Sequence, residues 1–159
     1  MVNNLEDIRR MQKYLTFFLN GKTYAVSITK AKEILEYEKI TTIPRMPEYI
    51  FGAINIRGKI IPVVDLCQCL EDKSSEITRR SCIVIVEVKY NEKITNVGIL
   101  VDAVSQVMDF SASDIEPSPQ LGLDVNADFI EGLAKMGGQF VVLLNIDIIL
   151  GCSEQLWLD

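Results

Sequence analysis

The sequence predicts a mainly β protein that folds into two small barrels packed together, and three observations predict this fold class. Apolar and polar residues alternate with a period of two in most segments, as they do in strands. Two stretches have the pattern of strand, tight turn and strand. The second half of the chain also repeats the order of the first half. A hairpin-rich sheet of about seventy residues best covers its edges and its apolar face by curling into a barrel.

The first element is a hairpin in residues 14–28. Its turn is Asn20-Gly21, a dipeptide that favours the tight turn of a two-residue hairpin. A second hairpin covers residues 82–104, where a run of β-branched residues leads into a polar turn at Asn91-Glu92. The chain therefore carries one hairpin at the start of each half.

The segments that follow the two hairpins are related by a shift of eighty positions. Both copies run through a connection to a glycine, a strand, a turn centred on glycine, a hydrophobic strand and a short amphipathic tail. This shared order of parts indicates an internal duplication more strongly than any single match does. The aligned pairs include Gly52 with Gly132, Gly58 with Gly138, and Asp65 with Asn145.

The amphipathic tails, residues 64–70 and 144–157, predict short helical segments, the second of them at the C-terminus. We expect one domain over residues 12–155. Neighbouring copies can donate strands across their junction, so the two barrels need not follow the two halves of the chain. The expected division gives residues 21–72 mainly to the first barrel, and residues 80–150 plus the strand 13–20 mainly to the second.

Composition and charge argue against several classes of function. The 159 residues include 16 basic and 22 acidic side chains, so the formal net charge is -6 and a nucleic acid would be repelled. No stretch is long and apolar enough to cross a bilayer, so we expect no membrane insertion. The first fifteen residues lack the pattern of a secretory signal, and we therefore expect a cytoplasmic protein.

The sequence contains no histidine, which removes nucleophile pairs that depend on imidazole, histidine metal ligands and a phospho-accepting histidine. The cysteines lack the paired spacing of a zinc site, and thiols stay reduced in the cytoplasm. We expect them to be small buried hydrophobes, and we expect no catalytic residue, no cofactor and no metal. The cysteines are Cys67, Cys69, Cys82 and Cys152.

Two charged residues have both a structural and a functional interpretation. Arg57 shares the outer face of a strand with Asn55, next to the turn at Gly58, and is either a solvated turn residue or part of a recognition site for a partner. Glu33 is either an exposed acid among the neighbouring lysines Lys30 and Lys32 or a binding residue.

Three aspartates, Asp65, Asp102 and Asp147, end apolar strands. We interpret them as turn or cap residues in preference to a catalytic set, because sequence gives no distance between their carboxylates.

Several motifs, taken in order, resemble the CheW family of bacterial chemotaxis coupling proteins. The most specific is Asn55-x-Arg57-Gly58 followed by the strand Ile61-Pro62-Val63-Val64-Asp65-Leu66. The resemblance runs from about Tyr14 to Leu150. The other matching motifs are Glu33-Ile34, Pro44-x-x-Pro47-x-Tyr49-Ile50-x-Gly52, Gly98-Ile99-x-Val101-Asp102-x-Val104 and Glu131-Gly132.

The resemblance implies two five-stranded SH3-like barrels related by a pseudo-twofold axis. It also implies a non-catalytic adaptor that couples methyl-accepting chemoreceptors to the histidine kinase CheA. Its partners would be the cytoplasmic helical hairpin of the receptor and the regulatory domain of CheA, itself a CheW-like fold. Such an adaptor is cytoplasmic, is recruited to membrane-associated receptor arrays, and is expected to be a monomer in isolation.

The resemblance also assigns candidate binding residues. On the receptor side they are Glu33, Arg57, Val104 and Val107, the two valines lining an apolar groove where the barrels meet. On the kinase side they are Met46, Tyr49, Phe51 and Gly52, as an exposed apolar patch of the first barrel. A second kinase contact, which closes rings of adaptor and kinase, would fall at Glu116 and Leu121, where this sequence departs from the basic and aromatic residues of relatives.

Two other classes of function stay open at this point. One is a barrel that binds a small ligand or a peptide outside chemotaxis. The other is an enzyme that uses the aspartates at the strand ends. Addition of receptor fragments and a CheA-type kinase separates the adaptor from both alternatives, because only an adaptor should form the ternary complex.

Overall fold

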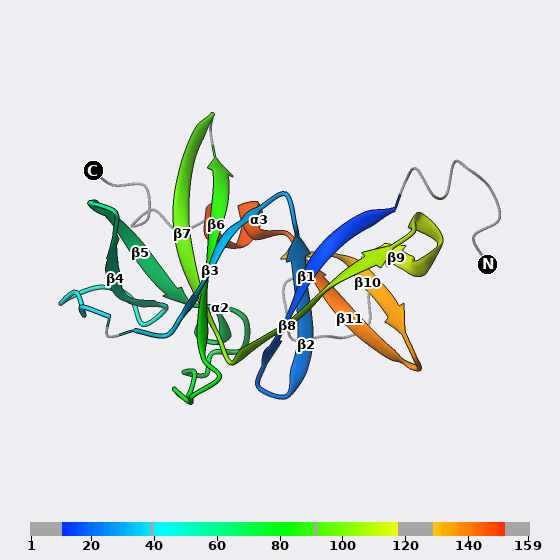
Figure 1. The fold of residues 1–159 in the computed structure, drawn as a ribbon, viewed down its shortest axis with the longest axis horizontal. Coiled ribbons are helices and arrows are strands. Elements are labelled where there is room, and N and C mark those ends of the chain that lie inside the picture. Colours follow the sequence, from blue (N-terminus) through cyan, green and yellow to red (C-terminus); the bar gives the residue numbers. More distant parts are fainter. Residues whose placement is uncertain (1–10, 39, 91, 118–128, 152–159) are drawn as a thin grey trace.

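The computed structural model describes residues 11–38, 40–90, 92–117 and 129–151. The described chain is mainly β, as predicted, with two short α-helices and one turn of 3-10 helix (Figure 1). Its elements are β1 (Gln12–Leu19), β2 (Lys22–Ser27), β3 (Ala31–Glu36), β4 (Ile50–Ile56), β5 (Lys59–Asp65), α2 (Leu66–Glu71), β6 (Cys82–Tyr90), β7 (Lys93–Val101), β8 (Ala103–Phe110), η1 (Ala112–Asp114), β9 (Ile115–Pro117), β10 (Ile130–Met136), β11 (Gln139–Leu144) and α3 (Ile146–Gly151).

The described strands form two sheets that lie on either side of α3 in Figure 1. The first barrel is a five-stranded sheet in the order β3-β6-β7-β5-β4, and the second is a six-stranded sheet in the order β8-β1-β2-β11-β10-β9. After β3 the chain crosses to β4, where Thr41 and Ala53 exchange two backbone hydrogen bonds of 2.9 and 3.1 Å. In the second barrel β9 makes the corresponding contact with β10. In each barrel, the segment that follows one edge strand, β3 or β8, thus pairs with the strand at the other side of the sheet, β4 or β10. This pairing closes the sheet into a barrel.

The sheet membership corrects the expected division of the chain. The first barrel is continuous in sequence, from β3 to β7, and the second is made of β1 and β2 together with β8 to β11. Residues 22–27 therefore belong to the second barrel and residues 82–101 to the first, the reverse of what we expected. The reason is that each copy gives its whole hairpin to the other copy, through the parallel pairs β5 with β7 and β11 with β2.

The internal repeat is confirmed by matched geometry. The strand order β3-β6-β7-β5-β4 corresponds to β8-β1-β2-β11-β10. The turns Arg57-Gly58 and Gly137-Gly138 have nearly equal φ angles, 50° and 85° in the first and 51° and 83° in the second. Each following strand ends at a side-chain helix cap, with Asp65 accepting from the backbone of Gln68 and Asn145 from the backbone of Ile148.

Buried apolar residues of the described chain gather in three clusters. One lies inside the first barrel and one inside the second. The third and largest, here called the central cluster, lies between the barrels and takes side chains from the outward faces of both sheets. The helices contribute to it through Leu66, Cys67, Leu70, Ile146, Ile149 and Leu150. Alternate residues of β6 and β7 therefore face two different cores, which explains why these strands are apolar on both sides.

The two α-helices, α2 and α3, each have six residues. Within the described ranges, no helix has the length and apolar character needed to span a bilayer.

Candidate functional site

The structure brings together the two charged residues that the sequence singled out. Arg57 and Glu33 form a bidentate ion pair, in which Nη1 donates to Oε1 at 3.2 Å and Nη2 to Oε2 at 2.8 Å. Glu33 lies on β3 and Arg57 in the turn between β4 and β5, so the pair connects the two edge strands of the first barrel. The Arg57 side chain is 76% exposed and that of Glu33 is 32% exposed.

Arg57 is held in place by the turn that carries it. Its φ angle of 50° is left-handed, and the side chain of Asn55 accepts a hydrogen bond of 3.0 Å from the backbone nitrogen of Gly58. Asn55 therefore stabilises the turn, and Arg57 alone reaches outward. The hydrogen bonds from Arg57 lower the pKa of the Glu33 carboxyl, and those to Glu33 raise the pKa of Arg57. Both partners are charged at neutral pH.

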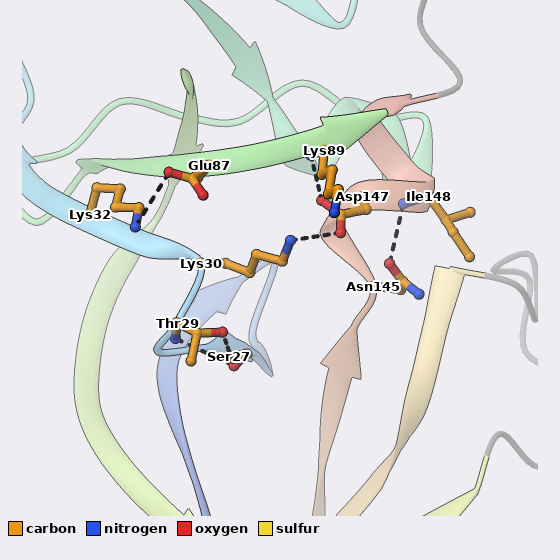
Figure 2. Close-up of polar contacts among 9 residues, drawn as sticks. All are labelled: Ser27, Thr29, Lys30, Lys32, Glu87, Lys89, Asn145, Asp147 and Ile148. Atoms are coloured by element: carbon orange, nitrogen blue, oxygen red, sulfur yellow. Dashed lines mark hydrogen bonds and ion pairs between the residues drawn. The ribbon is translucent and has the colours of Figure 1, made fainter. Parts of the chain in front are cut away.

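The lysines next to Glu33 in sequence do not contact it. Lys30 binds Asp147 of α3 at 2.7 Å, and Lys32 lies 3.4 Å from Glu87 of β6 (Figure 2). The interpretation of Glu33 as an acid solvated among lysines is therefore wrong.

Val104 and Val107 lie on β8, whose register places them opposite Phe17 and Leu15 of β1. Since opposed residues on neighbouring strands share a face, both valines point to the side of the central cluster. Val104 packs against that cluster, while Val107 is 49% exposed.

Ile34 is a further exposed apolar residue at the same junction. It is 48% exposed and lies on β3 opposite Val84, whose side chain belongs to the central cluster. Sequence reasoning did not assign Ile34 a role, although its place in an alternating strand, between Glu33 and Leu35, was available as a signal. Together, Ile34, Val104 and Val107 make an apolar rim around the junction of the two barrels, here called the junction rim.

The residues assigned to the kinase side are more buried than expected. Met46 and Tyr49 are half-buried against the central cluster, and Phe51 packs against the first-barrel cluster, with its ring 6.4 Å from that of Tyr37. Gly52 is buried. These four residues therefore do not form the exposed patch that we expected. A large apolar side chain on the neighbouring strand is exposed instead, Ile60 at 76%.

Gly52 has a clear structural reason to be glycine. A Cβ atom at this position would collide with the backbone carbonyl of Thr41, which pairs with the next residue along β4. Its repeat partner Gly132 is packed in the same way, with Glu116 O 2.6 Å from the position of a Cβ atom. Both glycines thus allow the closing segment of each barrel to approach.

Glu116 lies on β9 and forms an exposed ion pair of 3.2 Å with Lys135 of β10. Leu121 lies outside the described residues.

The interpretation of the strand-end aspartates as turn or cap residues is confirmed for Asp65 and Asp102, whereas Asp147 lies inside α3 and connects that helix to other elements. Asp65 caps α2 and also accepts hydrogen bonds of 2.9 and 2.7 Å from Ser75. Asp102 accepts from the backbone of Asn20 at 2.8 Å. Asp147 accepts from the backbone of Lys89 at 2.9 Å and pairs with Lys30, which connects α3 to the first barrel (Figure 2).

The cysteines within the described ranges are free thiols. Cys67 is buried and belongs to the central cluster, while Cys69 and Cys82 are half-buried; Cys152 lies outside the described residues. Burial raises the pKa of the Cys67 thiol to about 11 and that of Cys69 to about 12, with added repulsion from nearby carboxylates. These thiols are protonated at neutral pH, and a protonated thiol is a weak nucleophile.

Comparisons of this sequence with a family model and with known proteins indicate the same family. Residues 13–153 match the model of a protein family described as the CheW-like domain. The chain is 33% identical to the chemotaxis protein CheW of Bacillus subtilis over 145 residues, which cover 91% of this chain and 90% of the relative. It is 31% identical to that of Rhizobium meliloti over 144 residues, with 91% and 90% covered.

A solved structure shows the same fold. The crystal structure of the scaffolding protein TtCheW from Thermoanaerobacter tengcongensis superposes with a TM-score of 0.78 and 32% sequence identity. The match covers 87% of this chain and 92% of that one.

Proposed function

Because this chain belongs to the family of CheW-like domains, we propose that it is a chemotaxis scaffolding adaptor that couples chemoreceptors to the histidine kinase CheA. The observation that carries the proposal is that the family match spans both barrels and coincides with exposed apolar side chains at their junction. The adaptor makes and breaks no covalent bond; its effect on the kinase comes from holding two partners together.

On the receptor side, we assign the junction rim and the ion pair of Glu33 and Arg57. A helix of the receptor's cytoplasmic hairpin would cover the apolar side chains of Ile34, Val104 and Val107, and the charged pair would fix its register. Support comes from the exposure of Val107 and Ile34, each close to half. Exposed apolar side chains that form a contiguous patch are typical of a surface that a partner covers.

On the kinase side, we assign the surface around Met46, Tyr49, Phe51 and Gly52 to the regulatory domain of CheA. Gly52 and Phe51 would support the backbone under this surface, and the half-buried Met46 and Tyr49 would contribute their exposed atoms to the contact. Ile60, the most exposed of the large apolar side chains in the described ranges, lies on the neighbouring strand and adds contact area. Glu116 and Leu121 stay candidates for a second kinase contact.

The adaptor would act in the cytoplasm as a monomer that joins receptor arrays at the membrane. The test is reconstitution of the purified chain with receptor cytoplasmic fragments and a CheA-type kinase. We expect a ternary complex on size-exclusion chromatography and a change in kinase autophosphorylation that needs all three components. Binding of a small ligand or peptide without any response to receptor and kinase would instead support the alternative function.

The binding-site variant for this test is Arg57→Asp. We expect its circular dichroism spectrum and melting temperature to stay near those of the unmodified chain, because the ion pair is exposed and contributes little to stability. Capture by the receptor fragment should be lost. Loss of the fold in this variant would make Arg57 a structural residue and remove it from the binding site.

A further inference from the structure

A hollow of about 750 Å³ lies between the two barrels and is lined by none of the residues assigned to the receptor or the kinase. The turn between β1 and β2, the corner between β7 and β8, and the connection after α2 border it, and all three lie toward the lower edge of Figure 1. Phe18 and Ala103 give it apolar walls, and the turn Thr78–Arg80 supplies the opposite side. A ligand in this hollow would therefore touch both barrels.

Against the one negative charge of Asp102, Arg79 and Arg80 bring two positive charges to this hollow. Both are exposed, and no carboxylate of the described residues lies within 4.0 Å of either guanidinium. Asp102, the acid that also lines the hollow, accepts a hydrogen bond of 2.8 Å from the backbone of Asn20. Two adjacent arginines thus keep their full donor capacity.

The backbone that carries the arginines is fixed. The side chain of Ser81, which is 2% exposed, accepts a hydrogen bond of 2.8 Å from the backbone of Thr78, and the backbone of Ser81 donates to the carbonyl of Thr78 at 3.2 Å. The backbone of Arg80 donates to the Thr78 hydroxyl at 3.1 Å. A fixed backbone lowers the conformational entropy that the arginines would lose on binding.

We propose that this hollow docks an acidic peptide segment of a partner protein. Its carboxylates would bind the guanidinium groups of Arg79 and Arg80, and an apolar side chain of the segment would cover Phe18 and Ala103. The planar guanidinium group suits a carboxylate because it can donate two parallel hydrogen bonds. The chain as a whole has a net charge of -6, so most of its surface repels an acidic segment and this hollow offers a local exception.

The test is an NMR titration of the full-length, nitrogen-15-labelled protein with the peptide acetyl-Asp-Glu-Phe-Glu-Asp-amide. We expect saturable shifts at the backbone amides of Gly21, Arg79, Arg80 and Ala103, with a dissociation constant below about 1 mM. Binding should weaken as salt is raised, because exposed charge pairs are screened. The matched peptide acetyl-Asn-Gln-Phe-Gln-Asn-amide should produce no comparable shifts.

Two double variants with the same change in net charge complete the test. Arg79→Glu with Arg80→Glu should weaken binding at least about tenfold, since two attractive pairs become repulsive. Lys59→Glu with Lys93→Glu, at exposed positions that do not line the hollow, should leave the affinity within about twofold.

The proposal is overturned if the neutral peptide binds equally well, if both double variants lose affinity alike, or if no shift occurs near the hollow. It is also overturned if inorganic phosphate produces the same shifts and the acidic peptide does not. None of these outcomes depends on the receptor or the kinase, so they test this site separately from the proposed adaptor function.

Discussion

Glu33 and Arg57 neutralise each other in the free protein, so a partner that recognises either charge must share or replace the existing pair. This geometry allows two roles, and loss of binding by a folded Arg57→Asp variant would not by itself separate them. The pair could hold the β4–β5 turn against β3, or it could present its charges to the receptor. A reversal of both charges distinguishes these roles, because it keeps an ion pair and inverts its polarity.

We predict that Glu33→Arg with Arg57→Glu melts within a few degrees of the unmodified chain and still binds the receptor fragment at least about tenfold more weakly. Isothermal calorimetry and thermal unfolding measure the two effects. The control is the reversal Lys135→Glu with Glu116→Lys, an exposed pair of the second barrel, which should leave receptor affinity unchanged. Recovery of binding in the Glu33 and Arg57 reversal would show that the pair is needed only to hold the turn.

Gly52 leads to a prediction of the opposite kind, in which stability changes first. A Cβ atom there would meet the Thr41 backbone, so we predict that Gly52→Ala lowers the free energy of unfolding by about 1–3 kcal/mol, measured by urea denaturation. Gly132→Ala should have a similar effect at the repeated position. If Gly52→Ala keeps its stability and loses kinase binding, the glycine belongs to the interface itself.

The sequence predicted some residues of the candidate site but not the contacts between them. Arg57 and Glu33 were identifiable as candidates, but their direct contact was not, because β3, which carries Glu33, is paired with neither of the strands that flank the Arg57 turn. Burial of Phe51 and Gly52 was missed for a related reason. The segment that covers them, around Thr41, is irregular in structure and has no periodic pattern to place it.

At the scale of elements, one carboxylate makes two polar contacts between α3 and the first barrel, in addition to the apolar packing of the helix in the central cluster. Asp147 accepts a backbone hydrogen bond from Lys89 of β6 and pairs with Lys30, next to β3 (Figure 2). The Asp147 and Lys30 side chains are 30% and 29% exposed, so water screens their attraction in part. The backbone hydrogen bond should therefore be the larger contribution.

This ranking can be tested with three variants. We predict that Asp147→Asn and Lys30→Met each cost less than about 1 kcal/mol, because both keep an acceptor for the Lys89 amide. Asp147→Ala should cost about 1–3 kcal/mol, since that amide loses its partner. Urea unfolding measures the differences, and equal costs for all three variants would assign the effect to the ion pair.

The elements also explain the error in the expected barrel boundaries. Alternation and turn residues predicted the hairpins and the hydrophobic strands, because those signals are local. The partner of each hairpin depends on the parallel pairs of β5 with β7 and of β11 with β2, which bring together residues far apart in sequence. The periodicity of a strand does not determine which sheet the strand joins.

At the scale of the whole molecule, the central cluster makes the two barrels depend on each other. Both sheets give it one face, and the helices of both copies add to it. Removal of either barrel would expose this face to water. The two barrels should therefore unfold as one cooperative unit.

We predict that Ile99→Ala, on β7 in the central cluster, lowers the global free energy of unfolding by about 2–5 kcal/mol. Native-state hydrogen exchange of the Ile85 amide in the first barrel and the Leu133 amide in the second should then lose protection to the same extent. Loss confined to the first barrel would show that the barrels unfold separately.

The exchange of hairpins has one more consequence. Residues 72–81, which connect the two copies, contain no helix and no strand, so the backbone could be cut there without breaking any regular element. Each resulting fragment would lack a hairpin that only the other fragment carries. The chain is thus organised like a domain-swapped dimer whose subunits have been fused. Its two fragments should regain structure only when they are mixed, which makes them suitable as a split reporter.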